Sequence, residues 1–540
     1  MSVCRRDAKV CTVAKALAAV EDFQTIATGG FVGAGVPEAL THALEQRFLA
    51  QKRPRDLTII YAAGQGDGKD RGINHLAHEG LVRRVIGGHW GLAPRMGKLA
   101  MEEKIEAYNF PQGVICQLFR DIAAGRPGCI THVGLDTFID PAHKGGRLNE
   151  RSTESLVERI EIGGRTWLWY KSIPIHVGLI RATAADPKGN LVMHEEGIFG
   201  EMLPIAQAVH NSGGTVIAQV ARLMDEPALP QNVRVPGILV DRIVVAGPHE
   251  HPQTFGAAEF NPTLVSPLPP GASINDAIEP LPPGARRIIA ARACDEVGEG
   301  AIANLGIGMP EGIAVVAAER GLLQRFTLTV ESGPIGGVPA GGLSFGVSVH
   351  PDAIIDQPAQ FDFYDGRGLD FAALGAAEID REGNVNVSQF GPRLAGVGGF
   401  VNITQNARKL VFCGTFTTGG LEVAVEDGKL RIVSEGRLVK FVDRVEQLSF
   451  SADRSRRSGQ DVLYVTERAV FRLISHEKVS GTFCPQGPKG ASHKKCLTPF
   501  HGLELIEVAP GIDVRTQVLD LLPFEPIQRN VREMPGHVFD

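Results

Sequence analysis

Short apolar runs alternate with amphipathic segments along the chain, and glycines or prolines separate them. In the first half, this pattern predicts strands at TIAT from Thr25 and LTIIYAA from Leu57, with a helix over 37–48 between them. Proline suits the first turn of that helix, because its missing N–H would have no partner there. Strands that alternate with helices form mostly parallel sheets covered on both faces, which predicts an α/β fold.

The second half of the chain repeats this pattern. It predicts a strand at AIANLG from Ala301, a helix over 311–320 and a strand at RFTLTV from Arg325. Each half places glycines and a Pro-Glu pair before its helix, and DPKGNL from Asp186 is echoed by DREGNV from Asp380. We therefore predict two diverged copies of one open α/β unit, fused in one chain.

A proline-rich segment separates the two copies. Residues 266–287, SPLPPGASINDAIEPLPPGARR, contain two Pro-Leu-Pro-Pro-Gly pieces and are typical of a spacer between domains. A chain of 540 residues is also too long for one compact core. We predict an N-terminal domain over 1–265, a linker over 266–287 and a C-terminal domain over 288–540.

Composition and charge exclude several classes of partner. The net charge of −6 gives no basic surface for nucleic acid or an anionic membrane, and no apolar stretch is long enough to span a bilayer. The first residues, MSVCRRDAKVCTVAKAL, lack the apolar core of a secretory signal. We therefore expect a cytoplasmic protein without a nucleic-acid or membrane partner.

The eight cysteines are scattered, and the sequence predicts no metal site. Cys116, Cys129, Cys294 and Cys413 lie in apolar surroundings, as expected for buried, reduced thiols. Cys484 and Cys496 flank a loop that contains His493, but the spacing lacks the paired ligands of zinc motifs.

Glu331 is the candidate reactive group. It follows the apolar strand RFTLTV and precedes a loop, SGPIGGVPAGGLSFG, that is rich in glycine. It could be an acid that caps a turn, or the acidic residue of a dinucleotide site that begins at GIGMPEG, although Glu311 stands where that motif needs its third glycine. The third interpretation is a nucleophilic carboxylate held in a desolvated loop.

Several long motifs resemble one enzyme family. The segment ESGPIGGVPAGGLSFG resembles the active-site signature of family I CoA-transferases, and THVGLDTFIDP from Thr131 and GVGGFVNITQNARKLVFCGTFTTGGL from Gly396 are similar to other segments of that family. The resemblance covers roughly residues 20 to 520. It is greatest to the single-chain acetate/propionate type and weaker to succinyl-CoA:3-ketoacid CoA-transferase.

The resemblance implies roles for individual residues. It places the nucleophile at Glu331, which would carry CoA as a thioester, and a backbone N–H of an oxyanion hole at Gly398 or Gly399. Gln112, in FPQG, would face the reacting carbonyl. The glycines of the loop after Glu331 would lie at the CoA site; they are Gly336, Gly337, Gly341 and Gly342.

The resemblance also implies the reaction and its partners. The substrates would be short-chain acyl-CoA and acetate-like or propionate-like acids, without a further cofactor, in a homodimer or homotetramer with this CoA-transferase fold. The alternatives are an acyl-CoA hydrolase on the same scaffold and a non-catalytic CoA-binding or nucleotide-binding protein. One departure is an insertion of roughly twenty residues within 474–500, for which a surface loop is the simplest explanation.

Overall fold

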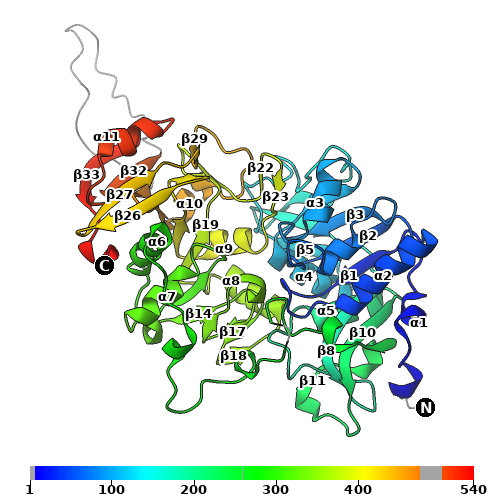
Figure 1. The fold of residues 1–540 in the computed structure, drawn as a ribbon. Helices are drawn as coiled ribbons and strands as arrows, with labels where there is room; N and C mark the ends of the chain where they lie inside the picture. Colours follow the sequence, from blue (N-terminus) through cyan, green and yellow to red (C-terminus); the bar gives the residue numbers. More distant parts are fainter. Residues whose placement is uncertain (1–5, 258, 475–501) are drawn as a thin grey trace, which may run out of the picture.

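The computed structural model describes residues 6–257, 259–474 and 502–540. The chain forms two lobes, each built around one large sheet (Figure 1). The first lobe, coloured blue to teal, contains the first half of the sequence, and the second, green to red, contains the second half. The predicted α/β class is confirmed, with mostly parallel strands at the centre of both sheets.

Five parallel strands form the centre of the first sheet, in the order β2-β1-β8-β10-β12. Their bounds are β1 (Thr25–Thr28), β2 (Leu57–Tyr61), β8 (Val177–Ala185), β10 (Thr215–Leu223) and β12 (Arg242–Val245). Beyond β2 the sheet continues in parallel with β3 (Val82–Gly87) and β4 (Glu106–Asn109). The antiparallel strands β9 (Leu191–Val192) and β11 (Val233–Val235) complete it.

The second sheet has the same parallel centre, in the order β14-β13-β19-β24-β30. Its strands are β13 (Ile302–Leu305), β14 (Thr327–Thr329), β19 (Phe371–Gly375), β24 (Lys409–Cys413) and β30 (Asp461–Val465). β31 (Ala469–Leu473), β32 (Leu503–Val508) and β33 (Ile527–Glu533) extend one edge, and β15 (Pro334–Ile335) and β18 (Ala353–Ile354) the other. The two centres therefore correspond strand for strand.

Two loops confirm that the halves repeat one unit. In DPKGNL, Asn190 donates its backbone N–H to Asp186 Oδ1 and its side-chain amide to Asp186 Oδ2, both at 2.9 Å. In DREGNV, Asn384 donates in the same way to Asp380, at 2.9 and 3.0 Å. The first loop follows the middle strand β8 directly, and the second follows the middle strand β19 after the short strand β20 (Glu378–Asp380). The similar segments DPKGNL and DREGNV thus form the same turn at corresponding places in the two units.

The elements predicted beside the glycine motifs form, with small shifts. Helix α2 (Glu38–Gln51) begins after Pro37, and helix α7 (Gly312–Glu319) begins after Glu311. The strand expected from Arg325 begins later, because a short 3-10 turn ends at Arg325. Helix α6 (Ala285–Cys294) starts inside the proline-rich segment, whose role as a domain boundary stays a prediction.

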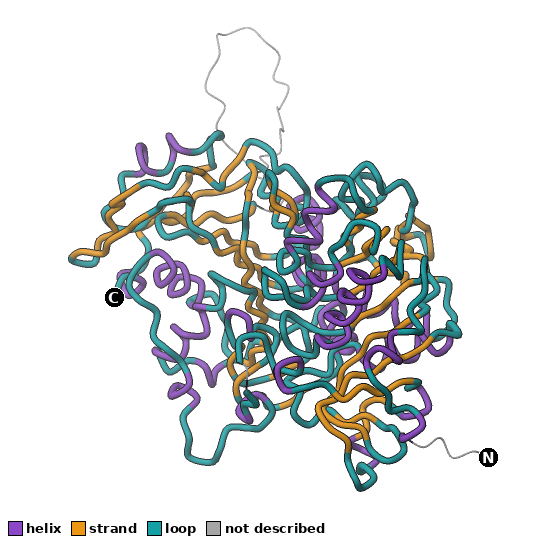
Figure 2. Tube along the Cα trace, turned by 45° about the vertical axis from the view of Figure 1, so that its right-hand side comes forward, coloured by secondary structure: helices purple, strands orange, loops and turns teal. Residues whose placement is uncertain are grey.

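Helices fill the space between the two sheets (Figure 2). α4 (Gln112–Ala123) of the first lobe packs against α8 (Gln357–Asp365) and α9 (Phe400–Asn406) of the second. The backbone N–H of Gly113 donates to Asn402 Oδ1 at 3.2 Å, and Gln117 Nε2 donates to Asp365 Oδ2 at 3.0 Å. These bonds hold α4 of the first lobe against α8 and α9 of the second.

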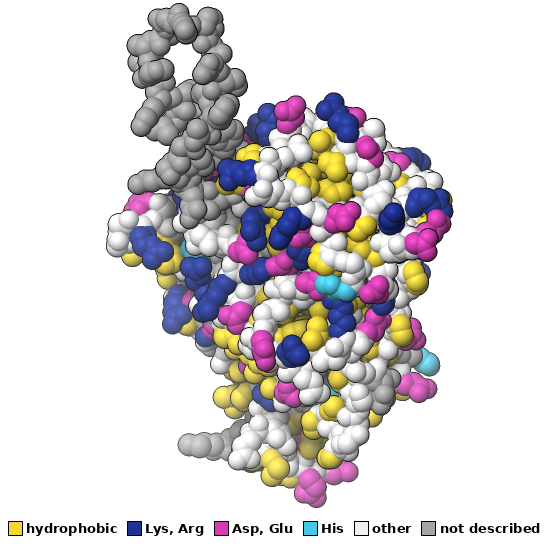
Figure 3. Space-filling view, turned by 90° about the vertical axis from the view of Figure 1, so that its left-hand side faces the viewer, with side chains coloured by type: hydrophobic (Ala, Val, Ile, Leu, Met, Phe, Trp, Pro, Cys, Tyr) yellow, Lys and Arg dark blue, Asp and Glu magenta, His cyan; other side chains and the backbone are white. Residues whose placement is uncertain are grey.

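The surface carries charges of both signs. On the face in Figure 3, basic and acidic side chains are interspersed, with small apolar areas between them. In the described part of the chain, no helix combines the length and apolar character needed to cross a bilayer. Cys116, Cys129, Cys294 and Cys413 are buried and unbridged, as predicted. The insertion, with Cys484, His493 and Cys496, lies outside the described residues.

Candidate active site

Glu331 stands two residues after strand β14 and is almost completely buried, with 8% of its surface exposed. Asn304, on the neighbouring strand β13, donates its side-chain amide to Glu331 Oε2 at 3.3 Å and to the carbonyl of Thr329 at 3.2 Å. Burial raises the pKa of Glu331, and hydrogen bonds from its own backbone N–H and from Asn304 partly oppose this. The site therefore holds a poorly solvated carboxyl group with one long hydrogen bond from another side chain.

The loop before α9 passes directly beside this carboxyl. A Cβ atom added to Gly399 would lie 3.5 Å from Cγ of Glu331. Among the loop's N–H groups, that of Val397 donates to Asn109 Oδ1 at 3.0 Å, and that of Phe400 to the Val397 carbonyl at 2.9 Å. Gly398 donates to the carbonyl of Gly88 at 2.8 Å.

Gly399 is the exception in this loop. Within the described residues, its N–H has no hydrogen-bond acceptor. Sequence reasoning named Gly398 or Gly399 as the oxyanion donor, and the structure separates them, because the Gly398 N–H is already engaged. An unpaired N–H next to a buried carboxyl is the geometry that a developing oxyanion needs.

Gln112 supplies a second unpaired donor. It is 2% exposed, at the first position of α4, and its backbone N–H donates to the carbonyl of Gly398 at 2.9 Å. Its Oε1 lies 3.5 Å from the position of a Cβ added to Gly398, and its Nε2 is buried without a partner among the described residues. Buried donors without partners are rare and costly, so one next to Glu331, at Gly399, and a second on the side chain packed against Gly398 together indicate a functional site.

The four glycines expected at a CoA site divide into two pairs. Gly336 and Gly337, with φ of 76° and 67°, form a tight turn. A Cβ added there would collide with the Asp352 carboxylate at Gly336 and with the Val349 carbonyl oxygen at Gly337. Gly341 and Gly342 lie on the surface instead.

The exposed pair lies beside the GIGMPEG loop. A Cβ added to Gly341 would be 3.6 Å from Glu311 Oε2. Two glycine motifs that are separate in the sequence therefore meet at the edge of the second sheet. Among the described residues, no group of His, Cys, Asp and Glu side chains is placed to hold a metal ion.

The sequence is similar to proteins that are named as CoA-transferases. The family model described as coenzyme A transferase matches residues 10–246. The acetate CoA-transferase YdiF of Escherichia coli K12 is 41% identical over 522 residues, which cover 96% of this chain and 92% of that protein. The chain belongs to the coenzyme A transferase family. A caffeate CoA-transferase of Acetobacterium woodii is 39% identical over 539 residues, covering 98% and 97% of the two chains.

A solved structure also supports the family membership of this CoA-transferase. The acyl-CoA transferase YdiF from E. coli O157:H7, described as a thioester complex with CoA, superposes with a TM-score of 0.87 at 39% identity. The match covers 99% of this chain and 96% of that one. The similarity to succinyl-CoA:3-ketoacid CoA-transferases is weaker, at 26% identity for a mouse protein over 74% of this chain. Family membership favours the nucleophile interpretation of Glu331 over a capping acid or a dinucleotide site.

Sequence reasoning missed two residues of the CoA-transferase site. Asn304 was placed only as part of the strand AIANLG, where a polar residue among apolar ones is the signal for a special role. His89, in GGHWG, lies against Gly398: a Cβ added to that glycine would be 3.7 Å from the Cβ of His89. Its sequence context is a glycine-rich turn, and nothing in it indicates a contact with a loop more than three hundred residues later.

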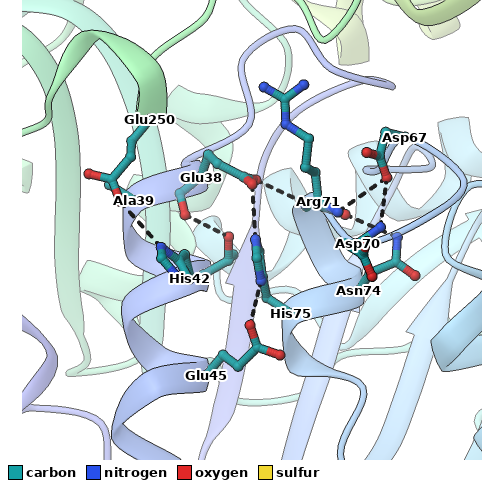
Figure 4. Close-up of polar contacts among 12 residues, drawn as sticks. Glu38, Ala39, His42, Glu45, Asp67, Asp70, Arg71, Asn74, His75 and Glu250 are labelled. Carbon is teal, nitrogen blue, oxygen red and sulfur yellow. Dashed lines mark hydrogen bonds and ion pairs between the residues drawn. The ribbon is translucent and has the colours of Figure 1, made fainter.

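A polar cluster of the CoA-transferase fixes the loop that follows β2 (Figure 4). His75 lies between two carboxylates, with Nε2 2.9 Å from Glu38 Oε1 and Nδ1 2.6 Å from Glu45 Oε2. Glu38 Oε2 also accepts the backbone N–H of Gly72 at 2.8 Å. This cluster anchors the segment 64–72, whose first residue, Gly64, packs on His89.

Proposed function

We propose that this enzyme moves CoA between short-chain acyl-CoA and acetate-like or propionate-like acids through a thioester on Glu331. The observation that carries the proposal is the buried Glu331 carboxyl beside Gly399, whose N–H has no acceptor among the described residues. A second donor without a partner in that part of the chain, Gln112 Nε2, belongs to a side chain that lies against the neighbouring Gly398. A carboxylate acts as a nucleophile when it is positioned and poorly solvated, and Glu331 meets both conditions.

The chemistry needs no proton transfer and no electron transfer. A Glu331 oxygen attacks the thioester carbonyl of the donor, forming a C–O bond and breaking the C–S bond, so that CoA leaves as a thiolate. The thiolate then attacks the glutamyl carbonyl of the mixed anhydride. The donor acid leaves as a carboxylate, and CoA stays bound to Glu331 through sulfur. An acceptor carboxylate reverses both steps, which gives ping-pong kinetics.

Each of these steps passes through a tetrahedral oxyanion. Gly399 and Gln112 come from different lobes and are set in place before substrate binds. Donors aimed in advance at a developing negative charge stabilise it without reorganisation, and one such donor contributes about 3 kcal/mol. The low exposure of Glu331 also limits the access of water, which would otherwise hydrolyse the glutamyl thioester.

An apolar cluster connected to the segment after Glu331 supports small, uncharged acyl groups as substrates. Ser332 donates its hydroxyl to the carbonyl of Gly346, and Gly346 packs against the ring of Phe31. These contacts join the segment after Glu331 to a separate apolar cluster, made of Phe31, Val32, Ala34, Ala63, Ile198, Leu264, Phe345 and Val347. An apolar wall accommodates a methyl or ethyl group without leaving a buried charge unpaired.

The test is to trap the intermediate. The enzyme is mixed with acetyl-CoA without an acceptor acid, digested and analysed by mass spectrometry. We expect an adduct of CoA mass on the peptide that contains Glu331, and none in Glu331→Gln. Glu299→Gln, which changes an exposed acid of the same lobe, is the matched control and should form the adduct normally.

Acceptor specificity is tested separately, because the relatives named above act on different acids. Acetate, propionate and caffeate are compared as acceptors for the trapped thioester, each by the rate at which the adduct disappears. We expect acetate and propionate to discharge it fastest. An adduct that disappears equally fast without any acid would indicate a hydrolase instead.

A further inference from the structure

The ring of His89 lies where three glycines from both lobes meet. A Cβ added to Gly64 would be 2.5 Å from the ring Nδ1, and one added to Gly91 would be 3.1 Å from Cε1. A Cβ added to Gly398 would be 3.8 Å from Cδ2. Three separate segments therefore leave a space that the flat imidazole fills, and at Gly64 a larger residue would displace the ring.

The backbone around His89 is bonded directly to the oxyanion loop. Trp90 and Gly91 both donate their N–H groups to the carbonyl of Ala395, at 2.7 and 2.9 Å. Gly398 donates back to Gly88 at 2.8 Å. The turn that carries His89 is therefore hydrogen-bonded to the loop on both sides of Gly396. The His89 ring packs against Gly398, next to Gly399.

The surroundings of the ring determine its protonation. Nδ1 is enclosed and has no partner among the described residues, so a proton on that atom would find no acceptor. Burial, with a smaller effect of Arg393, lowers the pKa of His89 to about 4. The ring is therefore uncharged at neutral pH, and it adds no charge beside the developing oxyanion.

We propose that His89 is a positioning residue, whose ring holds Gly398 in place and so directs the Gly399 N–H toward the oxyanion that forms when the Glu331 carboxyl reacts. This inference rests on the proposed function, because it assigns His89 a role in that reaction. A displacement of reacting groups by about 1 Å is enough to reduce a rate by roughly 100-fold. His89 acts through the loop and needs no contact with the substrate.

The experiment compares His89→Ala, Gly64→Ala and the double variant in the full-length enzyme. Gly64→Ala pushes the ring from the side opposite the loop, whereas His89→Ala removes it. We expect each single variant to lower kcat by 10- to 100-fold, with KM within about threefold of wild type. The double variant should be no slower than His89→Ala, because without the ring the added methyl group has nothing to push.

Further measurements separate positioning from a loss of folding. Added imidazole should restore part of the kcat of His89→Ala, and the rate of adduct formation on Glu331 should fall in parallel with kcat. Gly97→Ala is the matched control for the glycine substitution, since its new Cβ meets no atom closer than 3.9 Å. His249→Ala, at an exposed histidine, is the control for His89→Ala.

The outcomes separate this inference from the proposed function. Wild-type kcat in His89→Ala, a change confined to KM, or strictly additive effects in the double variant would overturn the role of His89 alone. A wild-type enzyme that never forms the Glu331 adduct would overturn the proposed function, and the role of His89 with it.

Discussion

The backbone N–H of Gly398 donates to the carbonyl of Gly88 at 2.8 Å, across the boundary between the two lobes. This bond uses the one N–H of the loop that could compete with Gly399 for an oxyanion. It also makes the geometry of the second lobe's loop depend on the end of β3 in the first lobe. The candidate active site is therefore shared by both halves of the chain, although its nucleophile belongs to the second.

The first prediction concerns Gln112. Gln112→Ala removes an unpaired buried donor, so we expect kcat to fall by about 100- to 1,000-fold, the usual cost of losing one oxyanion donor. Stability should change little or increase, because the native amide nitrogen has no partner to lose. The measurements are steady-state kinetics and thermal unfolding. A kcat within threefold of wild type would exclude Gln112 from the reaction.

The second prediction concerns Asn304 and the pH dependence of the rate. Burial raises the pKa of Glu331, and hydrogen bonds from its own backbone N–H and from Asn304 lower it. Only the ionised carboxylate attacks, so activity is lost as the pH falls through this raised pKa. Asn304→Ala removes one of the contacts that lower the pKa, and we expect the acid limb of kcat/KM to move to higher pH. If the acid limb of the pH profile did not move, Asn304 would not control the ionisation of Glu331.

The third prediction concerns the stability provided by His75. Burial alone lowers the pKa of His75, but the hydrogen bonds and charges of Glu38 and Glu45 outweigh it, and the pKa is raised. Burial raises the pKa of Glu45, but hydrogen bonds from His78 and His75 reverse this, and the pKa is lowered. The His75 contribution is complete below its unfolded pKa of about 6.5 and is lost as pH rises through the folded value.

The pH window follows from these signs. The stability that Glu45 contributes is lost as the pH falls through its lowered pKa. The cluster therefore stabilises the fold most between roughly pH 5 and 6.5. The other ionisable groups that face it are His42, whose ring centre is 5.1 Å from that of His75, and Arg95, 3.7 Å from Glu45.

Urea unfolding at several pH values tests this window. We expect His75→Gln to lower the free energy of unfolding by about 1–2 kcal/mol near pH 6 and by less above pH 8. His210→Gln, at an exposed histidine, should show no such trend. A His75→Gln difference that grows with pH would contradict the assigned protonation.

The fourth prediction uses the repeated loops. Asp186 and Asp380 accept the same pair of hydrogen bonds from Asn190 and Asn384. Both aspartates are buried, with at most 3% of their surface exposed. We expect Asp186→Ala and Asp380→Ala each to cost about 1–3 kcal/mol of unfolding free energy, because several buried donors lose their acceptor. If only one of the two substitutions lowered the free energy of unfolding, the two loops would not be structurally equivalent.

The sequence predicted the repeat because its signals are local. Strand and helix periodicity, the Pro-Glu pairs and the Asp-Gly-Asn turns all act within a few residues of each other. Glu331 was identified through its position after an apolar strand and through the long signature around it. Its environment could not be predicted in the same way, because Asn304, Gln112 and Gly399 reach it from three other segments.

The same reasoning explains why His89 was missed. Its partners are glycines, which give no side-chain pattern, and they lie in three segments of two lobes. The choice between Gly398 and Gly399 also depended on a bond to Gly88 that no local rule predicts. Local sequence patterns therefore predict the fold and the reactive residue Glu331. The groups that surround Glu331 cannot be predicted in this way, because they come together only when distant segments pack.

The two unpaired donors have a consequence for protein engineering. Each buried N–H without an acceptor destabilises the empty enzyme by about 1–3 kcal/mol relative to a satisfied one. A screen that selects only for heat resistance would favour substitutions that give Gly399 or Gln112 an internal acceptor. Such variants would melt later and turn over more slowly, so thermal tolerance and turnover should be selected together in this region.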